Sequence, residues 1–428
     1  MPPQPALRAI GLAPGTRPAQ SHGHMDLHSG APFWLVRNGL DAELEALHRD
    51  ERCDVAIVGA GVTGALVADA LITAGMDVVM VEQRMPGLGS TAASTALLQY
   101  EIDTELQDLI AVAGEPAAVR AYQLGVGAIE DLERLAAAIP DGFGFSRRHS
   151  LYLASRRHHA RRLEREHRLR CAHGLRTEWW DARQVERTYG FRSSGAIWSA
   201  DAAQADALRL TRHVLARACR RGLRLYARTN VIACETAGRR ASITCGRGHR
   251  VRARHIIFAT GYELPPMLSR GLVRLHSTYA LVTEPINLPA LGHGGWRGEC
   301  VVWESARPYF YMRMTDDNRI IAGGEDVPFT NAAARDAVMP ERTNRLMRRL
   351  RAMLPDVYPE LAFSWAGTFA ETTDGLPYIG TVPGHPAILV ALGYGGNGIT
   401  FSAIAARLLA GHCTGSPDRD LPIFRIDR

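Results

Sequence analysis

The chain has 428 residues, of which 46% are hydrophobic and 22% charged, values typical of a soluble globular enzyme with about two domains. Its formal net charge of +6 rests on arginine alone, because the sequence contains no lysine; this excludes Schiff-base catalysis and lysine-anchored pyridoxal cofactors. No apolar run is long enough to span a bilayer and the N-terminus has no secretory pattern, so we expect a cytoplasmic protein without a membrane span.

The first segment lacks any periodic pattern. Residues 1–30 are rich in proline, glycine, alanine and histidine, which predicts a flexible tail. His22, His24 and His28 fall in this tail and are not expected to hold a metal, because ordering a mobile segment costs free energy. The seven cysteines form no C-x-x-C pair, so we also expect no zinc site, iron–sulfur cluster or disulfide framework.

A strand, a helix and a second strand are predicted next. Residues 54–58 form a short apolar run typical of a buried parallel strand. Residues 62–74 have the length and the alanine and leucine content of a helix, and Gly75 follows where a left-handed cap is favoured. Residues 77–81 supply the second strand, so the segment predicts a βαβ unit.

Three glycines join the first strand to the helix with the spacing of a dinucleotide site. Gly59 allows the tight turn, Gly61 lets a pyrophosphate approach the backbone, and Gly64 lets the helix pack closely on the strand. The free N–H groups and partial positive charge at the helix start favour phosphates. Glu82 ends the second strand, where its carboxylate is suited to accept hydrogen bonds from both ribose hydroxyls. A carboxylate at this position repels a 2′-phosphate, so NADP is not expected as the cofactor.

The middle of the chain alternates helical and strand-like patterns. Helices are expected at residues 117–139, in an arginine-rich stretch after residue 154, and at 208–221. Strands are expected after a loop that begins at residue 142, and at 223–226, 230–235 and 255–262, with a hairpin at 241–251. The arginine clusters at 156–162 and 342–351 lie in helix-like stretches. Solvated helix faces explain both clusters, so no nucleic-acid partner is expected.

The later segments predict an antiparallel sheet and two more helices. Alternating strand-like runs occur at residues 278–283, 300–304, 309–314 and 319–322. Helices are expected at 335–353 and 403–410. The second of these follows a strand and a glycine-rich loop around residues 393–398, whose bare N–H groups are suited to stabilise negative charge.

With both glycine-rich segments in place, the sequence resembles the FAD-dependent amine and amino-acid oxidoreductases of the D-amino-acid oxidase, glycine oxidase and sarcosine oxidase superfamily. The resemblance covers nearly the whole chain from about residue 33. The Pro-Phe-Trp-Leu segment at 32–35 and the Asp-Gly-Leu-Pro-Tyr-Ile-Gly segment at 374–380 look most like the branch that includes gamma-glutamylputrescine oxidoreductases. The resemblance implies FAD as the cofactor.

The resemblance and the predicted elements together give an α/β fold with two interleaved domains. We expect a Rossmann-like FAD-binding domain of the glutathione-reductase type, a three-layer ββα arrangement, made of residues 31–110, 201–270 and 363–428. Residues 111–200 and 271–362 are expected to form a substrate domain with an antiparallel sheet.

The resemblance also implies where FAD is contacted. The adenosine half lies on the βαβ unit, Val231 falls beside the adenine, and Thr260 and Gly261 follow the pyrophosphate. The loop at 89–97 passes beside the flavin ring, and the amides of the loop at 395–400 face its pyrimidine side, where the reduced ring is negative. The expected FAD-binding residues are Gly59, Ala60, Gly61, Val62, Thr63, Gly64, Glu82, Gln83, Arg84, Thr91, Ser94, Leu97, Val231, Thr260, Gly261, Tyr262, Gly395, Gly396, Asn397, Gly398, Ile399 and Thr400.

The chain departs from its apparent relatives in the substrate clamp and in cofactor attachment. Amino-acid oxidases of the superfamily commonly have an arginine that clamps the substrate carboxylate where this chain has Phe369 and Ala370. Sarcosine oxidases attach FAD through a cysteine near this segment, but no cysteine lies between Cys300 and Cys413, so non-covalent FAD is expected. They also use lysines, one at the position of Thr400 and one that helps reduced flavin react with oxygen. Without lysine, an oxidase would need arginine or histidine to supply the oxygen-activating charge, and a dehydrogenase with another acceptor is an open alternative.

Candidate substrate-facing residues come from the second sheet and the C-terminal loop. Arg307, Tyr309, Tyr311, Phe369 and Asn397 are expected at the reacting centre, and Tyr279 is a further candidate. A surface salt bridge is the alternative for Arg307, and core packing is the alternative for the tyrosines. Trp303 is expected in the core and His276 in a structural role.

The expected activity is oxidation of the C–N bond of an amine, or of an N-substituted amino acid. Hydride transfers to flavin N5 and the imine then hydrolyses. The partners are therefore a small-molecule amine and O2 or another electron acceptor, with homo-oligomer formation left open. Three alternatives remain: an amino-acid oxidase with Arg307 as carboxylate clamp, a flavin-binding subunit inactive alone, and an enzyme with NAD as sole cofactor. The last leaves the C-terminal glycine loop without a purpose.

Overall fold

The computed structural model describes residues 8–9, 26–40, 43–238, 240–265, 267–268, 270–291 and 295–428. Most of the expected tail, with His22 and His24, lies outside the described residues. Its last three residues form strand β2 and pair with β17, so they depart from the expected flexibility. The ring Nε2 of His28 lies 3.0 Å from the Leu88 carbonyl oxygen, a backbone contact rather than a metal ligand.

The helices and strands are distributed along the whole described chain. The helices are α1 (Phe33–Asn38), α2 (Val62–Thr73), α3 (Ser90–Ala93), α4 (Leu106–Ala113), α5 (Glu115–Ala137), α6 (Arg157–Ala172), α7 (Ala182–Tyr189), α8 (Ala207–Arg220), α9 (Ala332–Met353) and α10 (Gly398–Cys413). The strands are β1 (Arg8–Ala9), β2 (His28–Gly30), β3 (Glu51–Val58), β4 (Val78–Val81), β5 (Leu97–Gln99), β6 (Ser146–Leu153), β7 (Thr177–Trp180), β8 (Ala196–Gln204), β9 (Arg224–Tyr226), β10 (Val231–Ala237), β11 (Arg240–Cys245), β12 (Arg250–Gly261), β13 (Arg274–Thr283), β14 (Cys300–Glu304), β15 (Phe310–Met314), β16 (Ile320–Pro328), β17 (Leu361–Glu371), β18 (Tyr378–Val382) and β19 (His385–Leu392).

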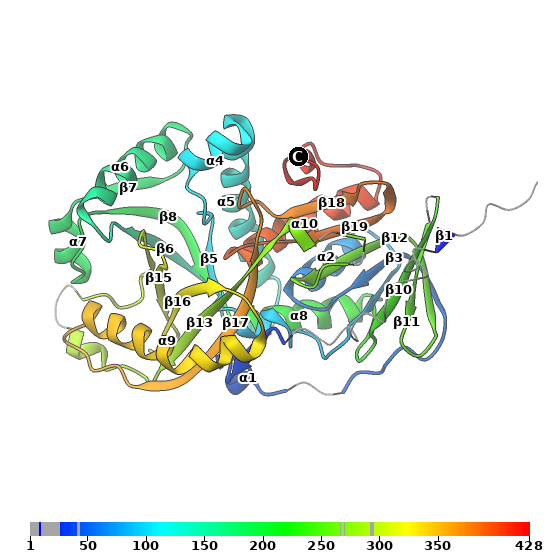
Figure 1. Cartoon of the computed structure of the whole chain (residues 1–428), viewed down its shortest axis with the longest axis horizontal. Coiled ribbons are helices and arrows are strands. Elements are labelled where there is room, and N and C mark those ends of the chain that lie inside the picture. The colour runs from blue at the N-terminus through cyan, green and yellow to red at the C-terminus, as the bar shows by residue number, and fades with distance from the viewer. Residues whose placement is uncertain are drawn as a thin grey trace, which may run out of the picture.

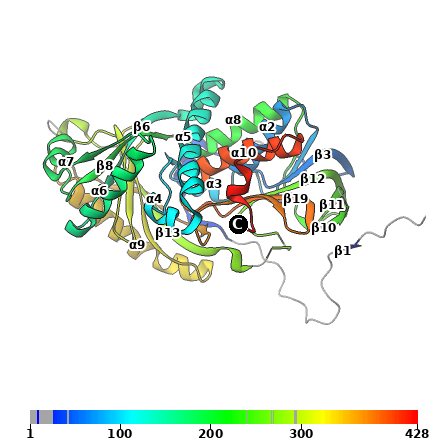
Figure 2. The same cartoon turned by 90° about the horizontal axis from the view of Figure 1, so that it is seen from above.

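The first sheet contains the predicted βαβ unit. β3 pairs in parallel with β4 and with β12, and β12 pairs in parallel with β19. These strands are apolar on both faces, as a buried parallel sheet requires. Helix α2 packs against α8 and α10, and the three helices gather on one side of the sheet in Figure 2. The Rossmann-like prediction is therefore confirmed.

β12 connects this parallel core to an antiparallel extension. Its first half pairs with β11, which pairs with β10, and its second half lies between β3 and β19. The predicted strand that ends in Ala-Thr-Gly therefore runs directly beside the first strand of the βαβ unit. That placement brings Thr260 and Gly261 to the same edge of the sheet as Gly59, where parallel strands end.

The second sheet has the order β2-β17-β13-β16-β15-β14-β6-β8-β5, and β7 pairs with β8. Every ladder is antiparallel except that of β14 with β6, which is parallel. Helix α9 packs on β13, β16 and β17. Helices α6 and α7 lie near β7 and β8, away from α9, at the upper left of Figure 1. This is the antiparallel sheet that was expected from residues 278–322. The sequence did not indicate its one parallel ladder.

Helix α5 lies between the two sheets in Figure 1 and packs against α10, α4 and β8. Its buried face is apolar and includes Leu124, Ile129 and Leu132. The predicted assignment of residue ranges to two domains stays a prediction. Among the helices of the described chain, none has both the length and the apolar character needed to cross a membrane.

Candidate functional site

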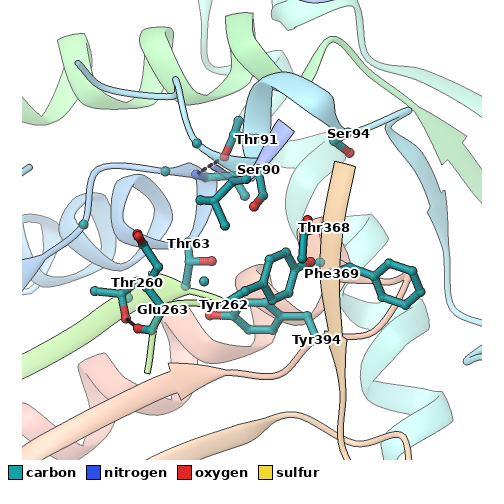
Figure 3. Close-up of a pocket in the computed structure, with 18 of the residues that line it drawn as sticks. Thr63, Ser90, Thr91, Ser94, Thr260, Tyr262, Glu263, Thr368, Phe369 and Tyr394 are labelled. Atoms are coloured by element: carbon teal, nitrogen blue, oxygen red, sulfur yellow. Dashed lines mark hydrogen bonds between the residues drawn. The ribbon is translucent and has the colours of Figure 1, made fainter. Parts of the chain in front are cut away.

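The turn between β3 and α2 is built as the glycine spacing predicts. Gly59 has a φ of 106°, which side-chain-bearing residues rarely adopt, and its N–H donates to the Val81 carbonyl oxygen at 2.9 Å. Gly61 is the N-cap of α2 and offers no side chain to satisfy the first helical N–H groups. The Val62 N–H instead donates to the Thr91 hydroxyl at 3.0 Å (Figure 3). The turn and the start of α3 are therefore held together.

Glu82 follows β4 directly and lies beside this turn. Its carboxylate accepts the Ala60 N–H and the Arg84 N–H, both at 2.8 Å. Burial raises the pKa of Glu82, while these two N–H groups act in the opposite direction. The acid predicted to bind ribose hydroxyls thus also fixes the backbone on either side of itself.

A large cavity of about 1240 Å³ runs from the turn to the second sheet. Figure 3 shows side chains from α2, α3 and β17 around it, including Thr63, Thr91 and Phe369. It brings together most of the residues that the sequence predicts at the site: Gly59, Gly61, Val62, Thr63, Glu82, Gln83, Arg84, Thr91, Ser94, Leu97, Val231, Thr260, Gly261, Tyr262, Gly395, Gly396, Asn397, Gly398, Ile399, Tyr309, Tyr311 and Phe369.

Three predicted FAD contacts do not line the cavity. Ala60 and Gly64 are buried in the turn, where the Ala60 N–H is held by Glu82 and Gly64 packs against the Gly59 carbonyl. Thr400 is 3% exposed, and its hydroxyl donates to the Gln99 carbonyl oxygen at 3.1 Å. These three residues are buried beneath the cavity lining and contact residues that form it.

The C-terminal glycine loop is tied to the segment after β5. The Gly396 N–H donates to Asp103 Oδ2 at 2.8 Å, and Tyr309 donates its hydroxyl to Asp103 Oδ1 at 3.1 Å. The Asn397 amide donates to the carbonyl oxygens of Glu101 at 2.7 Å and Gln99 at 3.2 Å. Asn397, predicted to face the substrate, therefore uses its amide N–H groups to hold the loop.

The second sheet forms an aromatic wall of the cavity. Tyr309, Tyr311 and Phe369 line it as predicted, and Trp303 lines it as well although it is only 6% exposed. Trp303 stacks on Tyr152 at a centroid distance of 3.6 Å. Burial raises the pKa of Tyr311 to about 12, so its hydroxyl stays protonated at neutral pH.

Two other candidates lie away from the cavity lining. Tyr279 is fully buried in the core, and its hydroxyl donates to the Arg335 carbonyl oxygen at 3.3 Å; the substrate-facing prediction was wrong because its position on β13 faces α9. Arg307 is exposed and does not line the cavity. Its guanidinium lies 4.5 Å from the Tyr309 ring centroid and donates to the Asp103 carbonyl oxygen at 2.9 Å.

The charged side chains of the cavity were largely missed from the sequence. Glu101, Asp103 and Asp326 line it toward the second sheet, whereas the one arginine among the described lining residues is Arg84, beside Glu82. The signal for Asp326 was a Gly-Gly-Glu-Asp run inside a strand pattern, since glycines in a strand indicate a bulge. Among the described residues, no group of three or more His, Cys, Asp or Glu side chains is placed to hold a metal ion.

Comparison with known proteins agrees with this geometry. The model of the family described as FAD dependent oxidoreductase matches residues 54–411. The chain is 26% identical over 380 residues to the glycine oxidase of Geobacillus kaustophilus, covering 84% of this chain and 92% of that protein. It is also 26% identical over 401 residues to the gamma-glutamylputrescine oxidoreductase of Escherichia coli, covering 88% and 87%.

A solved structure gives the same picture of the fold. The crystal structure of glycine oxidase from Geobacillus kaustophilus matches with a TM-score of 0.73 at 22% identity, covering 88% of this chain and 99% of that chain. Together these matches confirm the resemblance predicted from the two glycine-rich segments.

Proposed function

The chain belongs to the FAD-dependent oxidoreductase family, and from this premise we propose that it oxidises the C–N bond of an amine that lacks a clamped α-carboxylate. The observation that carries the proposal is the charge of the cavity lining. Toward the second sheet the described lining residues include three carboxylates and no arginine. An ammonium group suits such a wall, whereas a carboxylate there would meet like charges.

The cavity residues fit FAD. An added Cβ on Gly61 would lie 3.1 Å from the Thr91 hydroxyl, so a side chain there would crowd the start of α2, where a pyrophosphate would bind. We propose that Glu82 binds the adenosine ribose and Val231 contacts the adenine. The α3 segment and the loop at 395–399 would then enclose the flavin ring.

We further propose that FAD is held without a covalent bond. Among the described lining residues the one cysteine is Cys234, next to the adenine end. Burial raises the pKa of Cys234 to about 12, so its thiol is not the nucleophilic thiolate.

FAD, when bound, supplies the hydride acceptor for the oxidation. The chain's own side chains bind the amine and exclude water. Tyr309, Tyr311, Phe369 and Trp303 provide an aromatic wall, which shields the reacting carbon from water. Asp103 fixes both Tyr309 and Gly396, so it holds the wall and the glycine loop in one arrangement.

An anaerobic screen tests the proposed function. The purified protein is expected to be yellow, and anaerobic addition of dimethylamine, N-ethylmethylamine, benzylamine, putrescine, sarcosine and glycine in turn should bleach the flavin with at least one amine that lacks a carboxylate. A flavin that stays oxidised with every compound would contradict the proposal and favour a flavin-binding subunit that is inactive alone. Reoxidation by air or only by a dye then separates an oxidase from a dehydrogenase.

The alternative with Arg307 as carboxylate clamp rests on the position of its guanidinium over Tyr309 at the cavity edge. Sarcosine and N-ethylmethylamine form a matched pair that differs in the carboxylate. We expect Arg307→Ala to change the KM of both by the same factor, because Arg307 does not line the cavity. A rise of about tenfold or more for sarcosine alone would establish the clamp.

We propose a cytoplasmic location, O2 or another electron acceptor, and a homo-oligomer as an assembly to be tested. The location is supported by the seven cysteines, all of which are unpaired. The absence of lysine removes the residue type that relatives of the sarcosine oxidase kind use for oxygen activation, which favours testing a dye acceptor alongside O2.

A further inference from the structure

Asp326 reaches the cavity from a bulge in β16. The pairing of β16 with β13 shifts between Ser277 and Tyr279, so Thr278 faces two residues of β16. The first of these, Glu325, has a φ of 57° and accepts a hydrogen bond from Arg342 of α9 at 2.9 Å. The second, Asp326, lines the cavity. The bulge therefore separates two neighbouring carboxylates, one toward α9 and one toward the substrate space.

One carboxylate oxygen of Asp326 is unused. Its Oδ1 is shielded from solvent and has no hydrogen-bond partner among the described residues. Asp103, by contrast, has both oxygens engaged, by Tyr309 and by Gly396. Both carboxylate oxygens of Glu101 also lack a hydrogen-bond partner in the described chain, but Glu101 forms an ion pair with Arg170, with 3.8 Å between Oε1 and Nη1. Burying an unpartnered carboxylate oxygen is costly, so a donor from a bound molecule would satisfy it.

The surroundings of Asp326 include charges from several elements. Asp103 from the segment after β5 and Glu371 at the end of β17 disfavour its negative charge, while Arg307 favours it. Glu371 is itself 3.2 Å from the ring of His276 on β13. Burial first, then Asp103 and Glu371, raise the pKa of Asp326 from 3.8 to about 7, against the Thr278 hydroxyl and Arg307, which lower it.

We propose that Asp326 is a catalytic residue whose carboxylate pairs with the ammonium group of the amine substrate and accepts one proton from it before oxidation. The inference rests on the proposed function. In this step an N–H bond breaks and an O–H bond forms on Asp326, while the electron pair stays on nitrogen. An ammonium and a carboxylate become a neutral amine and a neutral acid, so charge is balanced, and the freed lone pair is what C–N oxidation requires.

The raised pKa matches this task. An alkylammonium has a pKa of about 10, so an ordinary carboxylate accepts its proton very rarely. The shift of Asp326 from 3.8 to about 7 makes the transfer about a thousandfold less unfavourable. Near neutral pH a large share of Asp326 is still ionised and able to accept.

A binding experiment tests the pairing without any turnover. The probe is tert-butylammonium, which carries no hydrogen on the carbon next to nitrogen and so is not oxidised. It is added to the FAD-loaded enzyme and followed by the flavin absorption spectrum. Asp326→Asn is expected to weaken its binding by about thirtyfold or more. Glu325→Gln, the matched control one residue earlier on the bulge, is expected to bind it as the wild type does.

The pH dependence tests the proton transfer. The wild-type affinity for tert-butylammonium should fall as the pH is lowered through about 7, because protonation removes the negative charge of Asp326. With an amine that reduces the flavin, Asp326→Asn should react only as free amine forms, so its stopped-flow rate should rise up to about pH 10. A loss of rate by the same factor at every pH would overturn the proton-accepting role.

The two hypotheses fail in different ways. If no amine bleaches the flavin, the proposed function fails while tert-butylammonium binding still reports on Asp326. If Asp326→Asn binds the probe as tightly as the wild type with the same pH profile, the role of Asp326 is overturned.

Should the variant lose its FAD, infrared spectroscopy of the wild type tests the pairing instead. The protonated carboxyl band at about pH 6 should diminish when the probe is added, and an unchanged band contradicts the pairing.

Discussion

Replacing Arg170 with methionine is expected to lower the free energy of unfolding by about 3–5 kcal/mol. Arg170 has no exposed surface, and its Nε donates to Glu166 Oε1 at 2.8 Å. Glu101 lies 3.8 Å from the same guanidinium and is also buried. Methionine keeps most of the side-chain volume but removes the charge, which leaves two buried carboxylates without the Arg170 cation.

The effect should reach the cofactor site. Glu166 also accepts the N–H groups of Leu106 and Gln107 at 2.8 and 3.0 Å, so it holds the start of α4. Glu101 lines the cavity, and its carbonyl oxygen accepts the amide of Asn397. Loss of Arg170 should therefore loosen the segment that supports the C-terminal glycine loop, and the variant should retain less FAD after gel filtration.

Arg168→Met is the matched control two residues earlier on α6. Arg168 pairs with Glu164 on the helix surface and is largely exposed, so its removal should change the free energy of unfolding by less than about 0.5 kcal/mol. Urea unfolding at one pH compares the two variants directly. Equal stability of both variants would show that the buried charges around Arg170 have relaxed to solvent or have taken up protons.

Local sequence was sufficient to predict the βαβ turn. Glycine spacing, helix composition and the acid after the second strand all lie within about thirty residues, and each has a conformational meaning independent of the rest of the chain. The structure places Gly59, Gly61 and Glu82 at the cavity, with Glu82 beside the glycine turn. The same holds for the C-terminal loop, although α10 begins at Gly398 rather than near residue 403. Packing of the helix on α2 outweighs the poor helix propensity of glycine there.

The substrate wall was harder to predict because it depends on which face of each strand meets the cavity. Alternation shows that Tyr279 and Tyr311 belong to half-buried strands, but not that one faces α9 and the other the cavity. Asp326 reaches the cavity through a bulge that exists only in the pairing of β16 with β13. β8 was missed because its sequence is rich in alanine and poor in β-branched residues.

Gly64→Ala is expected to remove FAD from the protein and to lower the free energy of unfolding by about 3 kcal/mol. An added Cβ at this position would overlap the Gly59 carbonyl oxygen and would lie 3.0 Å from the Gly59 carbonyl carbon. Gly59 cannot move away from the added Cβ. Its N–H is hydrogen-bonded to the Val81 carbonyl oxygen, and the Ala259 carbonyl packs against its Cα. Helix α2 must therefore shift away from β3, and its first N–H groups move with it.

Gly75→Ala separates this packing effect from a general cost of replacing glycine. Gly75 follows the other end of α2 with a φ of 79°, but no atom lies within 4 Å of an added Cβ. Its replacement should cost about 1 kcal/mol from the left-handed backbone alone and leave FAD bound. Flavin absorbance per protein and urea unfolding measure both outcomes. If Gly64→Ala kept its FAD and lost no more stability than Gly75→Ala, the result would contradict this prediction. The close packing of α2 on Gly59 would then not be required for FAD binding.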